Sequence, residues 1–179
     1  MNAPAHAVAT ATAAIDPAQY LTFMLARESF AIGILRIKEI IEYQGVTEVP
    51  LMPACVRGVI NLRGAVVPVM DLLARFGRGV GEITKRTCIV IVEVETEDGR
   101  QVMGLMVDAV NEVLDIAPDD IEPPPSFGAR IRTDFLLGVG KVRGKFVLLL
   151  NVDRVLSVDE IAGLAAVAAD APLGEPAIH

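Results

Sequence analysis

The sequence predicts a mainly β protein that contains two similar small β-barrels. Short apolar stretches of strand length are separated by turn residues along most of the 179-residue chain, and this spacing is typical of barrels and sandwiches. A motif of the first half also returns in the second half, which favours two related units. With 53% hydrophobic and 22% charged residues, a chain of this length can bury a core of its own.

The repeated motif is clearest where a glycine opens one strand and an Arg-Gly pair forms the following turn. Five positions match at a constant spacing of 80: Gly58, Val59, Arg63, Gly64 and Val67 correspond to Gly138, Val139, Arg143, Gly144 and Val147. Residues 31–41 can also be laid on residues 104–114 at a spacing of 73. We therefore expect a duplicated unit the size of a five-stranded barrel, with lobes at about residues 19–80 and 85–157. The crevice between two such lobes is a favoured binding place.

The expected strands have alternating or continuous apolar side chains and are bounded by turn residues. In chain order they are residues 19–25, 29–33, 55–62, 65–72, 87–95, 101–110, 111–116, 135–142 and 145–151. Asp98–Gly99 is a hairpin signal between the strands on either side, and Arg143–Gly144 joins the last two strands. The proline-rich residues 117–127 are expected to form an extended connection.

Short helices are expected between the strands. Residues 34–43 carry isoleucines at helical spacing, and their β-branched side chains favour only a short helix. Asp71 can cap a helical turn that Gly77 ends, and Asn151 holds the matching position in the second half.

The two ends of the chain are expected to lie outside the β region. Residues 1–18 are rich in Ala, Thr and Pro without apolar periodicity, which predicts a flexible N-terminal tail. Residues 158–179 are expected to form a short C-terminal helix and a tail. The helix would span about residues 158–168, because Ser157 and Glu160 form a capping box ahead of an Ala-rich stretch.

Charge and cysteine content exclude several classes of protein. The net charge of −7 and the pI of about 4.8 argue against nucleic acid as a partner and disfavour anionic membrane surfaces. Cys55 and Cys88 lie 33 residues apart, which indicates neither a disulfide framework nor a zinc site, and we expect buried reduced thiols. No apolar run is long enough for a transmembrane helix, and the N-terminus lacks the basic region of a secretory signal. A cytoplasmic location is therefore expected.

Catalytic groups are scarce in the sequence. The two histidines, His6 and His179, both lie in the tails, and the three serines occur in no nucleophile elbow. No phosphate-binding loop has the required spacing, and the carboxylates at residues 93–98 and 119–120 are typical of solvated turns. We expect no catalytic residue, no metal and no cofactor, and an enzyme of unknown type remains only a remote alternative.

The stretch around Arg63 admits two interpretations. Arg57 and Arg63 lie six residues apart among aliphatic side chains, and this composition is typical of an interface centre, so both are candidate contact residues. The alternative is a polar hairpin tip, in which Asn61 and Gly64 adopt positive φ and Arg63 is solvated. Pro68 is typical of an edge strand or a bulge, and an edge there could accept a partner.

These residues carry a resemblance to a known family. The stretch RGVINLRGAVVPVMDL at residues 57–72 resembles the signature of the CheW family, the chemotaxis coupling proteins. Four further segments match in the same order, at residues 30–40, 104–114, 135–142 and 148–156. The resemblance covers about residues 19–157, the expected CheW-like domain.

The resemblance implies a fold and a function. The family fold consists of two SH3-like five-stranded barrels packed together, which agrees with the duplication. The family is non-enzymatic and acts as an adaptor in chemoreceptor arrays. It couples the cytoplasmic tips of methyl-accepting chemoreceptors to the regulatory domain of the chemotaxis histidine kinase. This assignment implies no nucleic acid, no cofactor and no insertion into the membrane, with a location at receptor arrays through these partners.

The resemblance also implies partner-contact positions. They fall on Ile37, Glu39, Gly58, Arg63, Val110 and Val113. Ordinary core packing is the alternative for the three aliphatic residues, and a backbone position too tight for a side chain is the alternative for the glycine. Two further interpretations of the whole chain stay open. The stronger one is a paralogous coupling protein of a pilus-motility or developmental pathway. The other is a fragment of the kinase itself, which is disfavoured because no phosphotransfer helix bundle or ATP-binding sequence precedes the domain.

Overall fold

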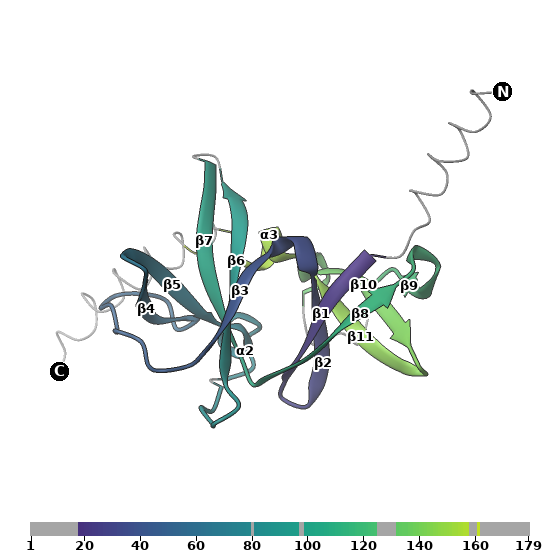
Figure 1. The fold of residues 1–179 in the computed structure, drawn as a ribbon, viewed down its shortest axis with the longest axis horizontal. Coiled ribbons are helices and arrows are strands. Elements are labelled where there is room, and N and C mark those ends of the chain that lie inside the picture. Colours follow the sequence, from purple (N-terminus) through teal and green to yellow (C-terminus); the bar gives the residue numbers. More distant parts are fainter. Residues whose placement is uncertain (1–17, 80, 97–98, 125–131, 158–160, 162–179) are drawn as a thin grey trace.

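Eleven strands form two sheets in the part of the chain that the structure describes (Figure 1). This computed structural model describes residues 18–79, 81–96, 99–124, 132–157 and 161. The strands are β1 (Ala18–Leu25), β2 (Glu28–Gly33), β3 (Ile37–Glu42), β4 (Val56–Leu62), β5 (Ala65–Asp71), β6 (Cys88–Thr96), β7 (Gly99–Val107), β8 (Ala109–Ile116), β9 (Ile121–Glu122), β10 (Leu136–Val142) and β11 (Lys145–Leu150). The connecting turns and helices are η1 (Ile34–Arg36), α2 (Leu72–Arg75), η2 (Pro118–Asp120), η3 (Thr133–Phe135) and α3 (Val152–Val155). The predicted fold class, mainly β with two barrel-like sheets, is confirmed.

Each sheet forms one lobe, and the two lobes have the same strand arrangement. Lobe I has the order β8-β1-β2-β11-β10-β9, and lobe II has the order β3-β6-β7-β5-β4. In both lobes two antiparallel pairs are followed by one parallel pair, β2 with β11 in lobe I and β7 with β5 in lobe II. Apart from the two-residue β9, every strand of lobe I has a counterpart in lobe II, as the duplication predicts.

The lobes do not follow the predicted division at residues 19–80 and 85–157. Lobe II consists of β3 to β7, one continuous stretch, whereas lobe I combines β1 and β2 with β8 to β11. Each lobe therefore contains the first two strands of one repeat and the last three strands of the other. Sequence similarity between the repeats cannot reveal this exchange. A strand finds equivalent neighbours whether it pairs within its own repeat or with the other repeat.

The matching hairpins have the same backbone geometry. The β4–β5 register shifts between Val56 and Gly58, and the β10–β11 register shifts at the equivalent Leu136 and Gly138. The arginines of the two turns, Arg63 and Arg143, have φ angles of 51° and 52°. The spacing of 80 residues thus reflects a true structural repeat.

The predicted helical caps are confirmed where the structure describes them. The Asp71 carboxylate caps α2, and the Asn151 side chain caps α3 at the matching position. Residues 158–160 and 162–168 of the predicted C-terminal helix lie outside the described residues, as do the predicted C-terminal tail and most of the predicted N-terminal tail. The amide of Ile161 donates to the Ser157 carbonyl oxygen at 2.9 Å, as in a helical turn.

Three expected local elements differ in the structure. Residues 34–43 do not form a helix: three of them make the 3₁₀ turn η1, and β3 follows. β3 contains a bulge between Ile37 and Glu39, and the isoleucines that suggested a helix do not share one face, since Ile37 lies opposite Val92 and Ile41 opposite Ile89 on the other face of the sheet. The proline-rich connection contains η2 and β9 rather than extended chain alone. Pro68 lies on the inner strand β5, immediately before its pairing with β7 begins, and the edge strand is β4.

The largest hydrophobic cluster lies between the lobes rather than inside either barrel. It contains apolar residues of β1 and β2 from lobe I and of β5, β6 and β7 from lobe II. A row of phenylalanines runs through it, with ring centroids 6.2, 5.7 and 5.8 Å apart along Phe23, Phe30, Phe76 and Phe135. Each barrel has a smaller cluster of its own. The expected crevice is therefore filled by this inter-lobe core.

Two arginines tie α3 of lobe I to lobe II. Arg36 forms an ion pair with Asp153 of α3, and its Nη2 donates to the Glu93 carbonyl oxygen on β6 at 3.3 Å. Arg75, at the end of α2, donates through Nε to the Val155 carbonyl oxygen at 2.7 Å. The hydrogen bond from Arg36 lowers the pKa of the Asp153 carboxyl. These contacts hold the lobes in one relative position.

Replacing Arg75 by methionine should lower the free energy of unfolding by about 2 kcal/mol, because the buried bond to Val155 is lost while the side-chain volume is kept. Urea unfolding followed by circular dichroism measures the change. Arg86→Met is the control, since the Arg86 side chain is exposed, and it should stay within about 0.5 kcal/mol of the parent protein. Equal losses in the two variants would contradict the role of Arg75 as an inter-lobe tie.

Candidate partner-binding surface

The edge strand β3 presents aliphatic side chains at the border of the inter-lobe core. Ile37 and Ile40 lie opposite Val92 and Val90 of β6, and directly paired residues project from the same face of a sheet. Both valines belong to the inter-lobe core. Ile37 packs against that core, whereas Ile40 keeps 42% of its surface exposed.

The edge strand β8 repeats this arrangement from the other lobe. Val110 and Val113 lie opposite Phe23 and Leu21 of β1, and both of these partners belong to the inter-lobe core. Val110 packs against the core, and Val113 is 46% exposed. The two strands thus contribute matching pairs of aliphatic residues at the matching spacing of 73.

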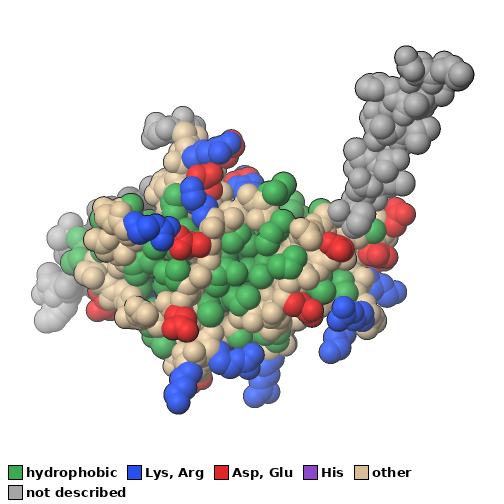
Figure 2. Space-filling view, viewed as in Figure 1, with side chains coloured by type: hydrophobic (Ala, Val, Ile, Leu, Met, Phe, Trp, Pro, Cys, Tyr) green, Lys and Arg blue, Asp and Glu red, His purple; other side chains and the backbone are tan. Residues whose placement is uncertain are grey.

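These four residues, Ile37, Ile40, Val110 and Val113, are called the β3–β8 patch below. Figure 2 shows hydrophobic side chains gathered in the middle of one face, where the two lobes meet. The half-buried Cys88, at the start of β6, interacts with the backbone of Val110, so the edges of the two lobes lie close together there. Burial raises the pKa of the Cys88 thiol, which keeps it protonated and uncharged at neutral pH. The neutral Cys88 thiol therefore adds no charge beside the patch.

Glu39 and Arg63 form an ion pair that connects the two end strands of the lobe II sheet. Glu39 lies on β3 and Arg63 in the β4–β5 turn, with Nη1 to Oε1 at 3.3 Å. Glu112 and Arg143 repeat this pair in lobe I at 4.0 Å. The hydrogen bond from Arg63 lowers the pKa of Glu39, so this carboxylate stays charged to lower pH than usual. Arg63 nevertheless remains 72% exposed and accessible to a partner.

Arg57 has a different position from Arg63. Its Nη1 lies 3.2 Å from Oδ2 of Asp71, a carboxylate whose side chain is only 1% exposed. The same carboxylate accepts hydrogen bonds from three backbone amides, those of Leu73, Ala74 and Gly81. Arg57 therefore balances a buried charge that organises the chain around α2, and this gives it a structural role whether or not it also contacts a partner.

Gly58 lies too close to neighbouring backbone for any side chain. A Cβ atom there would sit 2.3 Å from the Thr47 carbonyl oxygen, and φ is +153°. Thr47 and Val59 exchange two backbone hydrogen bonds of 2.8 Å, so Thr47 cannot move away without breaking them. Any side chain at position 58 would therefore disturb β4 itself, whether or not it also blocked a partner.

The predicted site residues thus divide into three groups. Ile37, Val110 and Val113 belong to the β3–β8 patch, and Glu39 and Arg63 form the ion pair between β3 and the β4–β5 turn. Arg57 and Gly58 lie at the start of β4, where Arg57 pairs with the buried Asp71 and Gly58 passes close to the Thr47 backbone. The sequence analysis missed Ile40 as a site residue, although the spacing of 73 that pairs it with Val113 was available.

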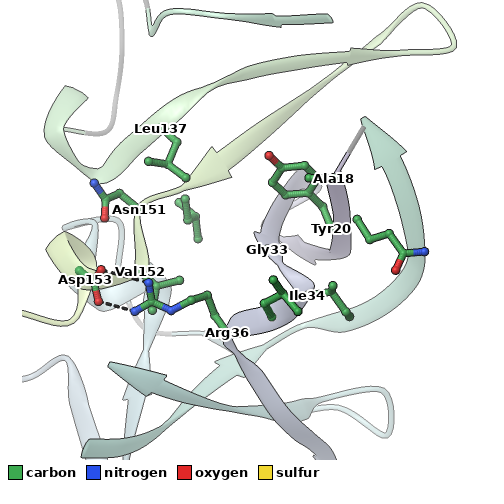
Figure 3. A pocket seen from close by; sticks show the side chains of 12 residues that line it. Ala18, Tyr20, Gly33, Ile34, Arg36, Leu137, Asn151, Val152 and Asp153 are labelled. Carbon is green, nitrogen blue, oxygen red and sulfur yellow. Dashed lines mark hydrogen bonds and ion pairs between the residues drawn. The ribbon is translucent and has the colours of Figure 1, made fainter. Parts of the chain in front are cut away.

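A hollow that the sequence did not indicate lies where β1, η1, β10 and α3 meet (Figure 3). Its volume is about 640 Å³, and the Arg36–Asp153 ion pair lies along its wall. The apolar part of its lining is formed by Tyr20, Ile34, Leu35, Leu137, Leu150 and Val152. No sequence pattern could find it, because these residues come from four separate segments.

Among the described residues, no group of three His, Cys, Asp or Glu side chains is placed to hold a metal ion. None of the helices among the described residues is both long and apolar enough to cross a membrane. The β3–β8 patch is aliphatic, and Glu39 and Glu112, which lie next to it on β3 and β8, form ion pairs with Arg63 and Arg143.

Comparison with known proteins identifies the family. The model of the CheW-like domain matches residues 19–160. The chain belongs to the CheW family. This finding confirms the resemblance seen in the sequence, and the chain is thus a member of a family of chemotaxis coupling and scaffold proteins.

Individual relatives resemble the chain over most of their length. The chemotaxis protein CheW of Rhizobium meliloti is 34% identical over 79% of this chain and 89% of its own length. The CheW of Klebsiella aerogenes is 32% identical over 80% of this chain and 84% of its own. The protein FrzA of Myxococcus xanthus is 32% identical over 71% of this chain and 82% of its own.

A solved CheW structure has the same fold. The scaffolding protein TtCheW from Thermoanaerobacter tengcongensis superimposes with a TM-score of 0.71 and 36% sequence identity, covering 78% of this chain and 87% of that one. The two-lobed architecture described here is thus the CheW fold.

Gly58→Ala should destabilise the protein by about 3 kcal/mol, because the methyl group would overlap the Thr47 carbonyl and the backbone would be strained. Thermal or urea unfolding measures this. Gly33→Ala is the matched control, since a Cβ atom there meets nothing within 4 Å. If Gly58→Ala proved as stable as Gly33→Ala, the proposed close approach to Thr47 would be wrong.

Proposed function

We propose that this protein is a non-enzymatic chemotaxis adaptor, which couples methyl-accepting chemoreceptors to the chemotaxis histidine kinase in signalling arrays. The observation that carries the proposal is the CheW fold with an exposed aliphatic patch at the border of its two lobes. Each partner would bind a different surface of one rigid two-lobed body. The protein would act in the cytoplasm, at receptor arrays that it reaches through these partners.

The β3–β8 patch is the proposed contact for the receptor. A receptor tip is a helical hairpin, and an amphipathic helix can place its apolar face in a hydrophobic groove. Ile40 and Val113 are exposed for such a contact, and Ile37 and Val110 hold the patch to the core beneath. Because the inter-lobe core fills the space beneath these residues, the helix would lie on the surface across this border.

The β4–β5 hairpin is the proposed contact for the regulatory domain of the kinase. Arg63 is exposed in its turn, and Val66 is 71% exposed on the following strand. An exposed arginine beside an exposed aliphatic side chain combines directed hydrogen bonds with apolar contact. Many such contacts in an array compensate for the weakness of each one.

A second candidate function rests on the similarity to FrzA. That similarity is compatible with a CheW-like coupling protein of another chemosensory pathway, such as pilus motility or development. The surfaces would be the same, and the receptor and kinase would differ. Co-sedimentation with receptor fragments and kinases of each pathway tests the two candidates directly.

Ile40→Asp and Val113→Asp should each weaken binding to a receptor cytoplasmic fragment about tenfold or more, because each places a charge in the apolar contact. Co-sedimentation of the purified proteins measures binding. Ile83→Asp is the matched control, since Ile83 is 47% exposed and lies outside the patch. Receptor binding by both patch variants at the level of the control would rule out the patch as the receptor contact.

Arg63→Glu should leave the fold intact and reduce binding of the kinase regulatory domain about tenfold. The new carboxylate lacks the hydrogen-bond donors of the guanidinium and would repel acidic groups of the kinase domain that Arg63 contacts. Pull-down with the isolated domain measures this. The double variant Glu39→Arg with Arg63→Glu restores the internal ion pair without restoring Arg63. It should remain impaired if Arg63 contacts the kinase directly. Full recovery in the double variant would show that only the internal pair matters.

A further inference from the structure

The two hairpin tips share one backbone but carry different side chains. In the β4–β5 tip Asn61 lies opposite Val66, and in the β10–β11 tip Lys141 lies opposite Phe146. Both turns consist of an arginine and a glycine at positive φ. The spacing of 80 residues therefore allows the tips to be compared position by position, with lobe II as an internal reference.

The reference tip in lobe II has little unsatisfied charge. The Asn61 side chain accepts a hydrogen bond from the Gly64 amide at 2.8 Å, which closes the turn. Arg63 is held by two contacts to Glu39. Ala65 and Val66 complete the tip without adding charge.

The β10–β11 tip in lobe I carries three cations. Lys141 and Lys145 replace Asn61 and Ala65 of the reference tip, and both are exposed and make no ion pair with any described residue. Arg143 is 75% exposed and reaches Glu112 only at 4.0 Å. Three cations on one hairpin stand out in a chain with a net charge of −7.

The same tip exposes an aromatic ring. Phe146 replaces Val66 of the reference tip and is 61% exposed, whereas four other phenylalanines stack in the inter-lobe core. Phe146 lies directly across from Lys141, so the ring and the ammonium group project from the same face of the hairpin. Figure 1 shows this hairpin reaching the end of lobe I that lies farthest from lobe II.

We propose that the β10–β11 tip is a docking site for an acidic segment of a partner protein that also presents an apolar side chain. The carboxylates would pair with Lys141, Arg143 and Lys145, and the apolar side chain would pack on Phe146. A short segment touches only the tip, where the charge is positive. A flat anionic membrane would also face the acidic remainder of the molecule and would be repelled by it.

The site is separate from the receptor and kinase contacts proposed above, and its test needs neither partner. The probe is a fluorescein-labelled peptide of glutamates with two leucines, and binding is followed by fluorescence anisotropy at low and at high salt. The native protein should bind this peptide, and high salt should weaken the binding because the contact depends on charge. A matched peptide with lysines in place of the glutamates should not bind.

Exchange of the tips provides the decisive variants. Lys141→Asn, Lys145→Ala and Phe146→Val together give the lobe I tip the chemistry of its counterpart and should lower peptide affinity at least about tenfold. The reciprocal changes in lobe II, Asn61→Lys, Ala65→Lys and Val66→Phe, should create a second binding site. Urea unfolding of both variants checks that the fold is kept.

Three outcomes would overturn the proposal. One is the absence of peptide binding by the native protein, and another is unchanged affinity in the folded lobe I variant. The third is binding to phosphatidylserine vesicles without binding to the peptide, which would assign the tip to a membrane instead. Phe146→Val alone separates the two parts of the contact, because it should weaken binding while leaving the salt dependence in place.

Discussion

The arrangement of the molecule depends on the apolar core between the two lobes. In most two-lobed proteins the boundary between the lobes is a minor contact, whereas here it holds the largest hydrophobic cluster, including the stacked phenylalanines. The chain crosses this border from β2 to β3 and again from β7 to β8, and no described strand of one sheet pairs with a strand of the other. The packing of the core, rather than strand pairing, therefore holds the lobes together.

The exchange of strands between the repeats determines where a binding surface can form. β3 and β8 are the end strands of their sheets, and each borders the inter-lobe core. Residues on an end strand have a neighbour on one side only, so part of their apolar surface stays exposed. Ile40 and Val113 are exposed for this reason, while Ile37 and Val110, next to the bulges of each strand pair, pack inward.

Much of the fold could be predicted because the responsible interactions are local. The hairpin strands follow from alternation and turn residues, and the cap at Asp71 needs only the amides of the next turn. The exchange of strands could not be predicted, because both repeats offer equivalent partners. The helix expected at residues 34–43 was wrong because the isoleucines that suggested it do not share one face: Ile37 packs on the inter-lobe core, whereas Ile41 lies opposite Ile89 and packs on the barrel core of lobe II.

The site residues differ in how far the sequence could predict their roles. The four aliphatic positions of the β3–β8 patch are related by the internal repeat, so the sequence contained the information that pairs Ile40 with Val113. The role of Arg57 depends on a carboxylate fourteen residues away that is buried only in the folded protein. The same holds for Gly58, whose importance comes from Thr47, a residue in a loop whose path the sequence does not specify.

One strand connects the two proposed contacts of lobe II. Glu39 and Ile40 are neighbours on β3 and project from opposite faces, since Glu39 lies opposite Ile91 inside the barrel and Ile40 lies opposite Val90 in the inter-lobe core. Glu39 holds Arg63 at the proposed kinase contact, and Ile40 belongs to the proposed receptor contact. A displacement of β3 by a receptor helix would therefore shift the partner of Arg63 by the same movement. In the proposed function β3 would thus link the two contacts, because it carries Ile40 of the β3–β8 patch and Glu39, the ion-pair partner of Arg63.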